Sequence, residues 1–155
     1  MRRYVAVVVV VALGILTPAL RASAQPTGLT RYTLSLTIEI MRTKADGRSW
    51  DPDGGLPDPR LFGTIFFGKM RTDLESCYQT DTFTATCLTG LEIDVNEGMS
   101  LAVTVQDKDW VDDDDIGTVS VQLRDPIRAR GRWVPMRITG RIKSAVIALT
   151  PVERP

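Results

Sequence analysis

Apolar and polar residues alternate strictly over positions 32–40, and this is the clearest structural signal in the chain. The apolar members are Tyr32, Leu34, Leu36, Ile38 and Ile40. Successive side chains of a β-strand point to opposite faces of a sheet, so a period of two indicates a strand with one buried face. The segment therefore predicts a strand that packs one face against a core.

Seven further segments carry strand signals, because valine, isoleucine and threonine are frequent in them and short polar stretches separate them. They are residues 61–67, 76–83, 91–95, 101–106, 118–123, 133–138 and 142–149. No stretch repeats apolar residues at the helical period over the roughly ten positions that a helix needs. These patterns predict an all-β fold, an eight-stranded antiparallel β-sandwich.

Residues 1–24 have the pattern of a signal peptide. A basic start precedes an apolar run, and the small residues 22–24, Ala-Ser-Ala, supply a cleavage site. A membrane-spanning helix needs about 20 apolar residues, whereas Pro18 and Arg21 interrupt this run. We expect cleavage before Gln25 rather than an uncleaved anchor, and a protein that is secreted or periplasmic, with a signal of bacterial character.

Residues 25–155 then fit one domain, with its core at about 29–151. Three of the 19 basic residues leave with the signal peptide, so the mature chain is slightly acidic. So small an imbalance gives no reason to expect nucleic acid as a partner, and we expect a monomer. Trp50 and Trp133 are expected in the core or at the sandwich edge, and the basic segment 124–132 is expected to be a surface loop.

The two cysteines, Cys77 and Cys87, both lie in the exported part of the chain. Oxidising conditions outside the cytoplasm favour a disulfide between them. Free thiols that act in redox or metal chemistry are the weaker alternative, because the spacing is not CxxC and the chain contains no histidine. We therefore predict a Cys77–Cys87 disulfide.

Two acidic stretches, residues 46–58 and 107–115, hold ten of the 19 acidic residues. The second places six carboxylates in nine positions directly after a predicted strand. Like charges a few ångströms apart repel, and a hard divalent cation removes this repulsion while it uses the oxygens as ligands. A crowded, flexible set of carboxylates suits Ca²⁺ better than the strict octahedron of Mg²⁺. The absence of histidine disfavours zinc.

An acidic run can also be a solvated turn that keeps a strand edge from aggregating. Two observations favour the cation. Asp107 and Asp109 stand two positions apart at a strand end, a spacing that aims both side chains to the same face. A second acidic loop, over residues 51–59, precedes another predicted strand.

These acidic residues resemble the loops of the C2 domains, a family of eight-stranded sandwiches that hold calcium between loops at one end. The run 103–109, Val-Thr-Val-Gln-Asp-Lys-Asp, followed by 114–117, Asp-Asp-Ile-Gly, is similar to that family's third calcium loop. Asp58-Pro59 resembles its first loop. The family places an earlier aspartate about where Pro52 stands here, so Asp51 or Asp53 must serve instead.

The resemblance spans about residues 29–151 and implies a C2-like sandwich with bound Ca²⁺. The calcium ligands that it implies are Asp51, Asp58, Asp107, Asp109 and one of Asp114 or Asp115. Asp112 and Asp113 are expected to face solvent and to strengthen the local negative field.

Three functions follow from a C2-like calcium site. We expect an exported, non-catalytic module that binds a protein or a cell-envelope component, with calcium in a structural role. The alternative is calcium-dependent binding to anionic phospholipid membranes, as in many members of that family. Leu56, Trp110 and Val111 stand where membrane-inserting loop tips would be, although Trp110 can instead fold back over the loop base.

A calcium-dependent hydrolase is the remote third possibility. The chain has no histidine, no Gly-x-Ser-x-Gly elbow and no phosphate-binding glycine loop. Paired aspartates can hydrolyse glycosides, but here they would have to serve the metal and the reaction at once. We therefore expect no enzymatic activity.

Overall fold

The computed structural model describes residues 28–51, 54–109 and 113–153, so the predicted signal peptide lies outside the described residues. The secondary-structure elements are, in chain order, β1 (Thr30–Ile40), β2 (Pro59–Phe67), β3 (Met70–Asp73), β4 (Cys77–Tyr78), β5 (Thr84–Ala85), β6 (Glu92–Val95), β7 (Ser100–Asp107), β8 (Asp114–Gln122), α1 (Arg124–Ala129), β9 (Val134–Pro135), β10 (Arg137–Ile138) and β11 (Ile142–Pro151).

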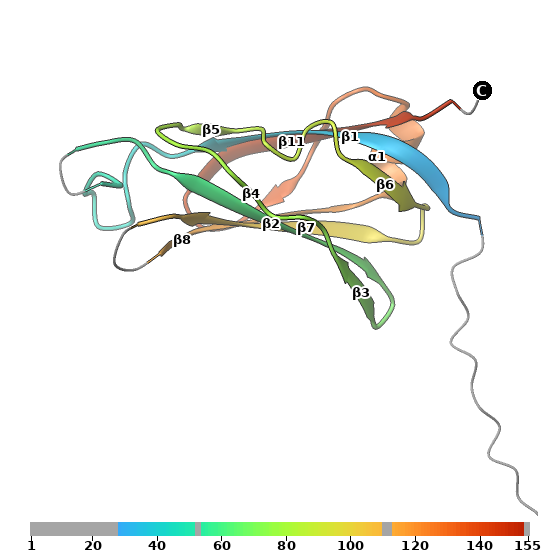
Figure 1. Cartoon of the computed structure of the whole chain (residues 1–155), viewed down its shortest axis with the longest axis horizontal. Helices are drawn as coiled ribbons and strands as arrows, with labels where there is room; N and C mark the ends of the chain where they lie inside the picture. Colours follow the sequence, from blue (N-terminus) through green and yellow to red (C-terminus); the bar gives the residue numbers. More distant parts are fainter. Residues whose placement is uncertain (1–27, 52–53, 110–112, 154–155) are drawn as a thin grey trace, which may run out of the picture.

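The strands form two antiparallel sheets that pack as the two layers of a sandwich (Figure 1). One sheet has the strand order β5-β1-β11-β9, with β6 also paired to β1. The other has the order β10-β8-β7-β2-β3, with β4 also paired to β2. The predicted fold class, an all-β antiparallel sandwich, is confirmed.

The core lies between the inner faces of the two sheets. Burial alternates along β1 and β7 with the period that the sequence shows. Six inward apolar residues of these two strands are fully buried: Leu34, Leu36, Ile38, Leu101, Val103 and Val105. Each such side chain contributes about 1.5–3 kcal/mol by its removal from water. The two strands therefore give the loops that follow them a rigid support.

Both acidic stretches come together at one end of the sandwich. Figure 1 shows the described parts of the β1–β2 connection, residues 41–51 and 54–58, at the same end as the end of β7 and the start of β8, whereas α1 lies at the opposite end. Pairing of β2 with β7 aligns Pro59 with Asp107, and pairing of β7 with β8 aligns Asp107 with Asp114. The loop end of the sandwich therefore carries most of the acidic residues singled out in the sequence.

Two predicted strands are wrong in their extent. Of residues 76–83, only β4 pairs with β2, because the chain turns away at Asp81, which has a φ of 50°. Residues 133–138 form two short strands in different sheets, β9 beside β11 and β10 beside β8. The chain crosses from one sheet to the other at buried Met136. The split of 133–138, together with β3 and β5, which the sequence pattern did not predict, gives eleven strand segments in the described residues rather than eight.

A short helix occupies part of the segment that was expected to be a surface loop. Helix α1 has six residues, too few for a helical period to appear, and Pro126 stands in its first turn, where its missing N–H is not needed. No helix among the described residues is long and apolar enough to cross a bilayer. Trp50 is 1% exposed, as expected for a core residue, whereas Trp133 is 54% exposed and lies outside the core.

The predicted disulfide between Cys77 and Cys87 is present. It ties β4 to the segment that follows β5, and the side chain of Gln79 strengthens this link. Its Oε1 atom accepts hydrogen bonds from the main-chain N–H groups of Thr86 and Cys87, at 2.7 and 3.1 Å. The segment 77–87 is thus held as one closed loop at the edge of β2.

Candidate metal centre

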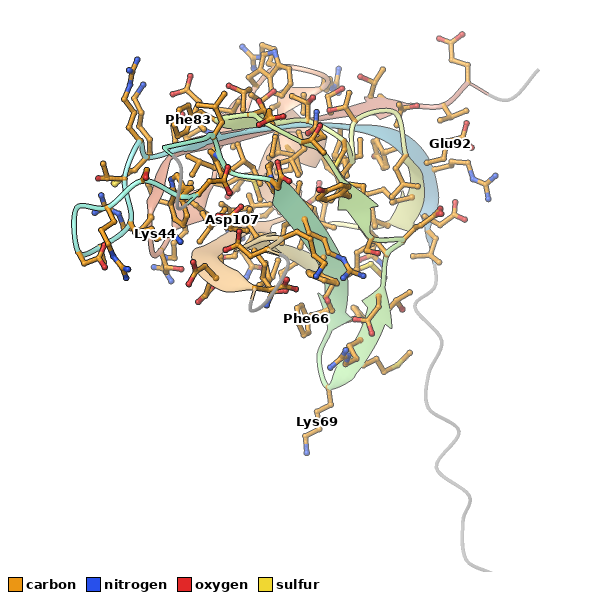
Figure 2. All side chains as sticks on the ribbon, turned by 60° about the vertical axis from the view of Figure 1, so that its left-hand side comes forward. Lys44, Phe66, Lys69, Phe83, Glu92 and Asp107 are labelled. Atoms are coloured by element: carbon orange, nitrogen blue, oxygen red, sulfur yellow. A yellow bond between two sulfur atoms is a disulfide. The ribbon has the colours of Figure 1, made fainter. Side chains whose placement is uncertain are left out.

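Three aspartates from the two acidic stretches converge at the loop end of the sandwich. One carboxylate oxygen from each of Asp51, Asp107 and Asp109 lies within 4.8 Å of the others. Asp107 is the last residue of β7, and Asp109 follows two positions later. Asp51 comes from the β1–β2 connection, 56 positions earlier than Asp107 in the chain. Figure 2 shows Asp107 at the same end of the molecule as Lys44 of that connection. We call these three residues the aspartate cluster.

Asp107 is the buried member of the cluster. Its side chain is fully buried, and it is the one charged residue in the buried set of the described chain. Its Oδ1 atom accepts a 2.6 Å hydrogen bond from the main-chain N–H of Asp58. Its Oδ2 atom is buried and has no hydrogen-bond partner among the described residues. A buried carboxylate oxygen left in this state is costly, so the site calls for a cation or a proton.

Electrostatic interactions within the cluster also favour a bound cation or proton. The pKa of Asp107 is raised to about 6, chiefly by burial and also by the negative charges of Asp109 and Asp51, while the Asp58 N–H and the Lys44 charge oppose the change. Two ionised carboxylates about 5 Å apart repel by roughly 3 kcal/mol at an effective dielectric constant of 20. A divalent cation would remove this repulsion and hold Asp107 in its ionised form.

Asp51 is positioned by the loop around it. The preceding residue, Trp50, is buried, and its indole N–H donates a 2.8 Å hydrogen bond to the Met41 carbonyl. Ser49 Oγ donates a 2.8 Å hydrogen bond to the carbonyl of Asp51. A Cβ atom at Gly55 would stand 2.3 Å from Asp51 Oδ2. Glycine at position 55 therefore leaves the space that the Asp51 carboxylate occupies.

Asp58 is placed beside the cluster, but its carboxylate is engaged elsewhere. Its oxygens accept hydrogen bonds from the Tyr78 hydroxyl, at 2.9 Å, and from the main-chain N–H of Asp81, at 2.7 Å. Its main chain makes two hydrogen bonds with the end of β7. Its N–H donates to the Asp107 carboxylate, and its carbonyl accepts a 3.0 Å hydrogen bond from the N–H of Lys108. Of the groups predicted as ligands, Asp58 thus contacts the cluster through its main chain.

The acidic residues at the start of β8 are separated by the strand itself. Asp114 aligns with Asp107 and forms an ion pair with the Lys44 ammonium. Asp115 is exposed and aligns with Gln106, so strand alternation puts it on the opposite face from Asp114. Asp113 is bound by Lys108 at 2.8 Å. Both Asp114 and Asp115 were predicted in a loop, yet they begin β8.

Several predicted site residues lie outside the described residues. Asp53, the alternative to Asp51, is one of them, and so are Asp112 and the loop-tip candidates Trp110 and Val111. Leu56, the remaining loop-tip candidate, is 38% exposed. It directly follows Gly55, whose backbone packs against Asp51. The exposed apolar side chain of Leu56 therefore belongs to the residue next to Gly55, which contacts Asp51 of the aspartate cluster.

The cluster fits a hard divalent cation. It offers only carboxylate oxygens, the ligands that calcium takes, and one of these oxygens is buried without a hydrogen-bond partner. Three carboxylates supply at most six oxygens, fewer than the upper end of the calcium coordination range of about six to eight. Water or an external ligand would complete the coordination of a bound ion.

Sequence reasoning missed three residues that shape this site: Lys44, Gly55 and Tyr78. Lys44 is a single lysine in a polar turn, and only the fold brings it to Asp114, 70 positions away. Tyr78 meets Asp58 across 20 positions. The glycine pair 54–55 was noted as a turn signal, but nothing in the pattern shows that Gly55 contacts a carboxylate.

No family model and no curated protein matches this chain. Among solved structures, it is similar to a single C2 domain of a plant extended synaptotagmin 1, at 12% identity and a TM-score of 0.46, covering 84% of this chain and 99% of that one. It is also similar to a pair of C2 domains of extended synaptotagmin 2, at 18% identity and a TM-score of 0.49, covering 97% and 48%.

A C2 domain protein from Ramazzottius varieornatus is similar at 16% identity and a TM-score of 0.40, covering 83% of this chain and 96% of that one. These are members of the family that the acidic motifs resemble. At such identities and TM-scores the likeness carries no argument about ligands, so the chemistry of this site rests on its own residues.

Proposed function

We propose that this protein is an exported, non-catalytic module that binds calcium at the aspartate cluster. The observation that carries the proposal is the fully buried carboxylate of Asp107, whose Oδ2 atom has no hydrogen-bond partner among the described residues and lies with two further carboxylates. Such an arrangement is unfavourable for an empty site and favourable for a bound hard cation. Asp51, Asp107 and Asp109 would hold the ion.

The role proposed for the ion is structural. It would join β7, through Asp107 and Asp109, to the β1–β2 connection, through Asp51, and these segments otherwise repel each other electrostatically. Outside the cell, calcium is abundant, and a site of modest affinity would be filled there. The filled loop end would then present a fixed surface to a protein or a cell-envelope component.

Binding to anionic phospholipid is the second candidate, and one observation favours it. Leu56 is exposed beside the cluster, and the coordination left open by three carboxylates could accept a phosphate oxygen. Sedimentation with vesicles of phosphatidylserine and phosphatidylcholine, in calcium and in chelator, separates the two candidates. Calcium-dependent sedimentation that Leu56→Ser weakens would support lipid binding, and its absence would leave the protein or envelope partner.

Calorimetric titration with calcium chloride tests the proposal itself. We expect a dissociation constant between about 10⁻⁵ and 10⁻³ M, in the range of sensor and extracellular sites, and at least tenfold weaker binding in Asp109→Asn. The matched control is Asp125→Asn, which removes one charge from α1 at the opposite end. Absence of calcium binding to the unmodified protein, or equal loss in the control, would contradict the proposal.

A further inference from the structure

One basic side chain reaches into the acidic loop end from the β1–β2 connection. The Lys44 ammonium forms an ion pair with Asp114 Oδ2 and stands 5.9 Å from the centroid of the Trp50 ring. Its side chain is only 20% exposed, against 43% for the nearby Lys108. Lys44 is thus the more enclosed of these two lysines.

The charges around Lys44 show what its ammonium does there. Asp114 aligns with Asp107 across the β7–β8 pair, and like charges directly opposite each other destabilise a sheet. The hydrogen bond with Asp114 is the largest of the effects that raise the pKa of Lys44, and the charges of Asp109 and Asp107 also raise it. The ammonium therefore interacts with the aspartate cluster as well as with its direct partner.

The turn that carries Lys44 is held in place from several sides. Lys44 N–H donates a 2.8 Å hydrogen bond to the Arg48 carbonyl, and Gly47 N–H donates a 3.1 Å hydrogen bond to the Lys44 carbonyl. Arg141 Nε donates a 3.0 Å hydrogen bond to the carbonyl of the neighbouring Thr43. The turn therefore holds the Lys44 ammonium in a fixed position, and its positive charge stays close to the aspartate cluster.

We propose that Lys44 is a built-in competitor of the metal: its ammonium neutralises Asp114, keeps that carboxylate out of the coordination sphere, and lowers the affinity of the aspartate cluster for calcium. This inference rests on the proposed function. The metal-free site is then only partly charge-compensated, and the calcium-bound site is only moderately tight. Such a site suits an ion that is plentiful in its surroundings.

Lys44→Gln is the variant that tests this role. Removal of one positive charge from the edge of the cluster should tighten calcium binding about tenfold at low ionic strength, and less in high salt, because salt screens the charge. Lys69→Gln removes the same charge from the turn between β2 and β3, far from the cluster (Figure 2). Lys44→Arg keeps the charge. Both controls should stay within twofold of the unmodified protein.

Thermal unfolding in chelator supplies a readout that needs no metal. Lys44→Gln should melt below the unmodified protein in chelator, because Asp114 and the cluster lose their counter-charge, and should gain more from added calcium. A second variant, Asp114→Asn, tests whether Asp114 is a calcium ligand. It should weaken calcium binding much less than Asp109→Asn does.

The outcomes separate cleanly. Calcium affinity of Lys44→Gln within twofold of the unmodified protein, or weaker, would overturn the role of Lys44 while the calcium site itself stands. A loss in Asp114→Asn as large as in Asp109→Asn would make Asp114 a ligand and overturn its assignment as the partner of Lys44. Failure of the unmodified protein to bind calcium would overturn this inference together with the proposed function.

Discussion

The main-chain N–H of Asp58 donates a 2.6 Å hydrogen bond to Oδ1 of Asp107, which joins the start of β2 to the end of β7. The other oxygen of the same carboxylate is buried and has no hydrogen-bond partner among the described residues. One half of the Asp107 side chain is therefore used by the fold, and the other half is left for a ligand. The different roles of the two Asp107 oxygens underlie the predicted pH dependence and calcium binding of the site.

Stability without metal should fall as pH rises, through Asp107. Its pKa in the folded protein, about 6, lies above its ordinary value of 3.8, so between these values the folded state binds the proton that the unfolded state has lost. Asp107 therefore adds roughly 2–3 kcal/mol to the unfolding free energy below about pH 4. This stabilisation is lost as the pH rises through 6.

Urea unfolding in chelator at pH 4.5 and pH 7 measures this effect, with Asp107→Asn as the reference because it removes only this titration. The difference in unfolding free energy between the two proteins should favour the unmodified chain more at the lower pH. Calcium should abolish the trend, because the bound ion holds Asp107 ionised. An identical pH dependence of both proteins would contradict the burial argument.

A methyl group at position 55 should displace Asp51. The Cβ atom of Gly55→Ala would lie 2.3 Å from Asp51 Oδ2, so the carboxylate must move and calcium binding should weaken about tenfold or more. Gly98→Ala is the control, because its φ is not in the left-handed region and a Cβ atom there comes no closer than 3.3 Å to any neighbouring side chain. Calorimetry that finds equal affinities for the two variants would show that Asp51 is not a ligand.

Asp58 should behave as a structural residue in spite of its place in the predicted ligand set. Tyr78→Phe removes the 2.9 Å hydrogen bond to its carboxylate and should cost about 1 kcal/mol of unfolding free energy. Asp58→Asn keeps the main-chain contact with Asp107, so its calcium affinity should fall less than that of Asp109→Asn. Titrations in which Asp58→Asn is the weaker binder would assign the Asp58 carboxylate to the metal.

Loss of the disulfide should destabilise the protein and affect the metal only indirectly. A bridge between Cys77 and Cys87 closes a sequence separation of 10 residues, for which chain entropy gives a stabilisation of roughly 2–3 kcal/mol. Denaturant unfolding of Cys77→Ser with Cys87→Ser measures it. The bridge lies beside Tyr78 and not within the aspartate cluster, so the double variant should still bind calcium with at most a small loss of affinity. Complete loss of binding would contradict this.

The strand pattern and the acidic motif could be predicted from sequence because both are local. The alternation over 32–40 and the run after β7 need no knowledge of the fold, and they indicated the sandwich and the position of Asp107 and Asp109. The break of 133–138 into two strands was missed because its cause, the crossing between sheets at Met136, is tertiary. Local patterns also cannot show a helix as short as α1.

The partners of individual aspartates could not be predicted either, because they depend on tertiary contacts between residues that are distant in the sequence. Asp58, Asp114 and Asp115 look equivalent to Asp107 in a sequence motif. The fold engages Asp58 with Tyr78, pairs Asp114 with Lys44 and exposes Asp115. These differences depend on residues 20 and 70 positions away and on strand register.

Thermal unfolding of the protein in calcium, in magnesium and in chelator, beside the double variant Asp107→Asn, Asp109→Asn, tests the central claim most directly. At a calcium concentration about 100 times the dissociation constant, binding stabilises the folded state by about 2.7 kcal/mol, which corresponds to a rise of several degrees in Tm. We expect this rise for the unmodified protein, a smaller one in magnesium, and none for the variant. An equal Tm in calcium and in chelator would contradict a calcium site at the aspartate cluster.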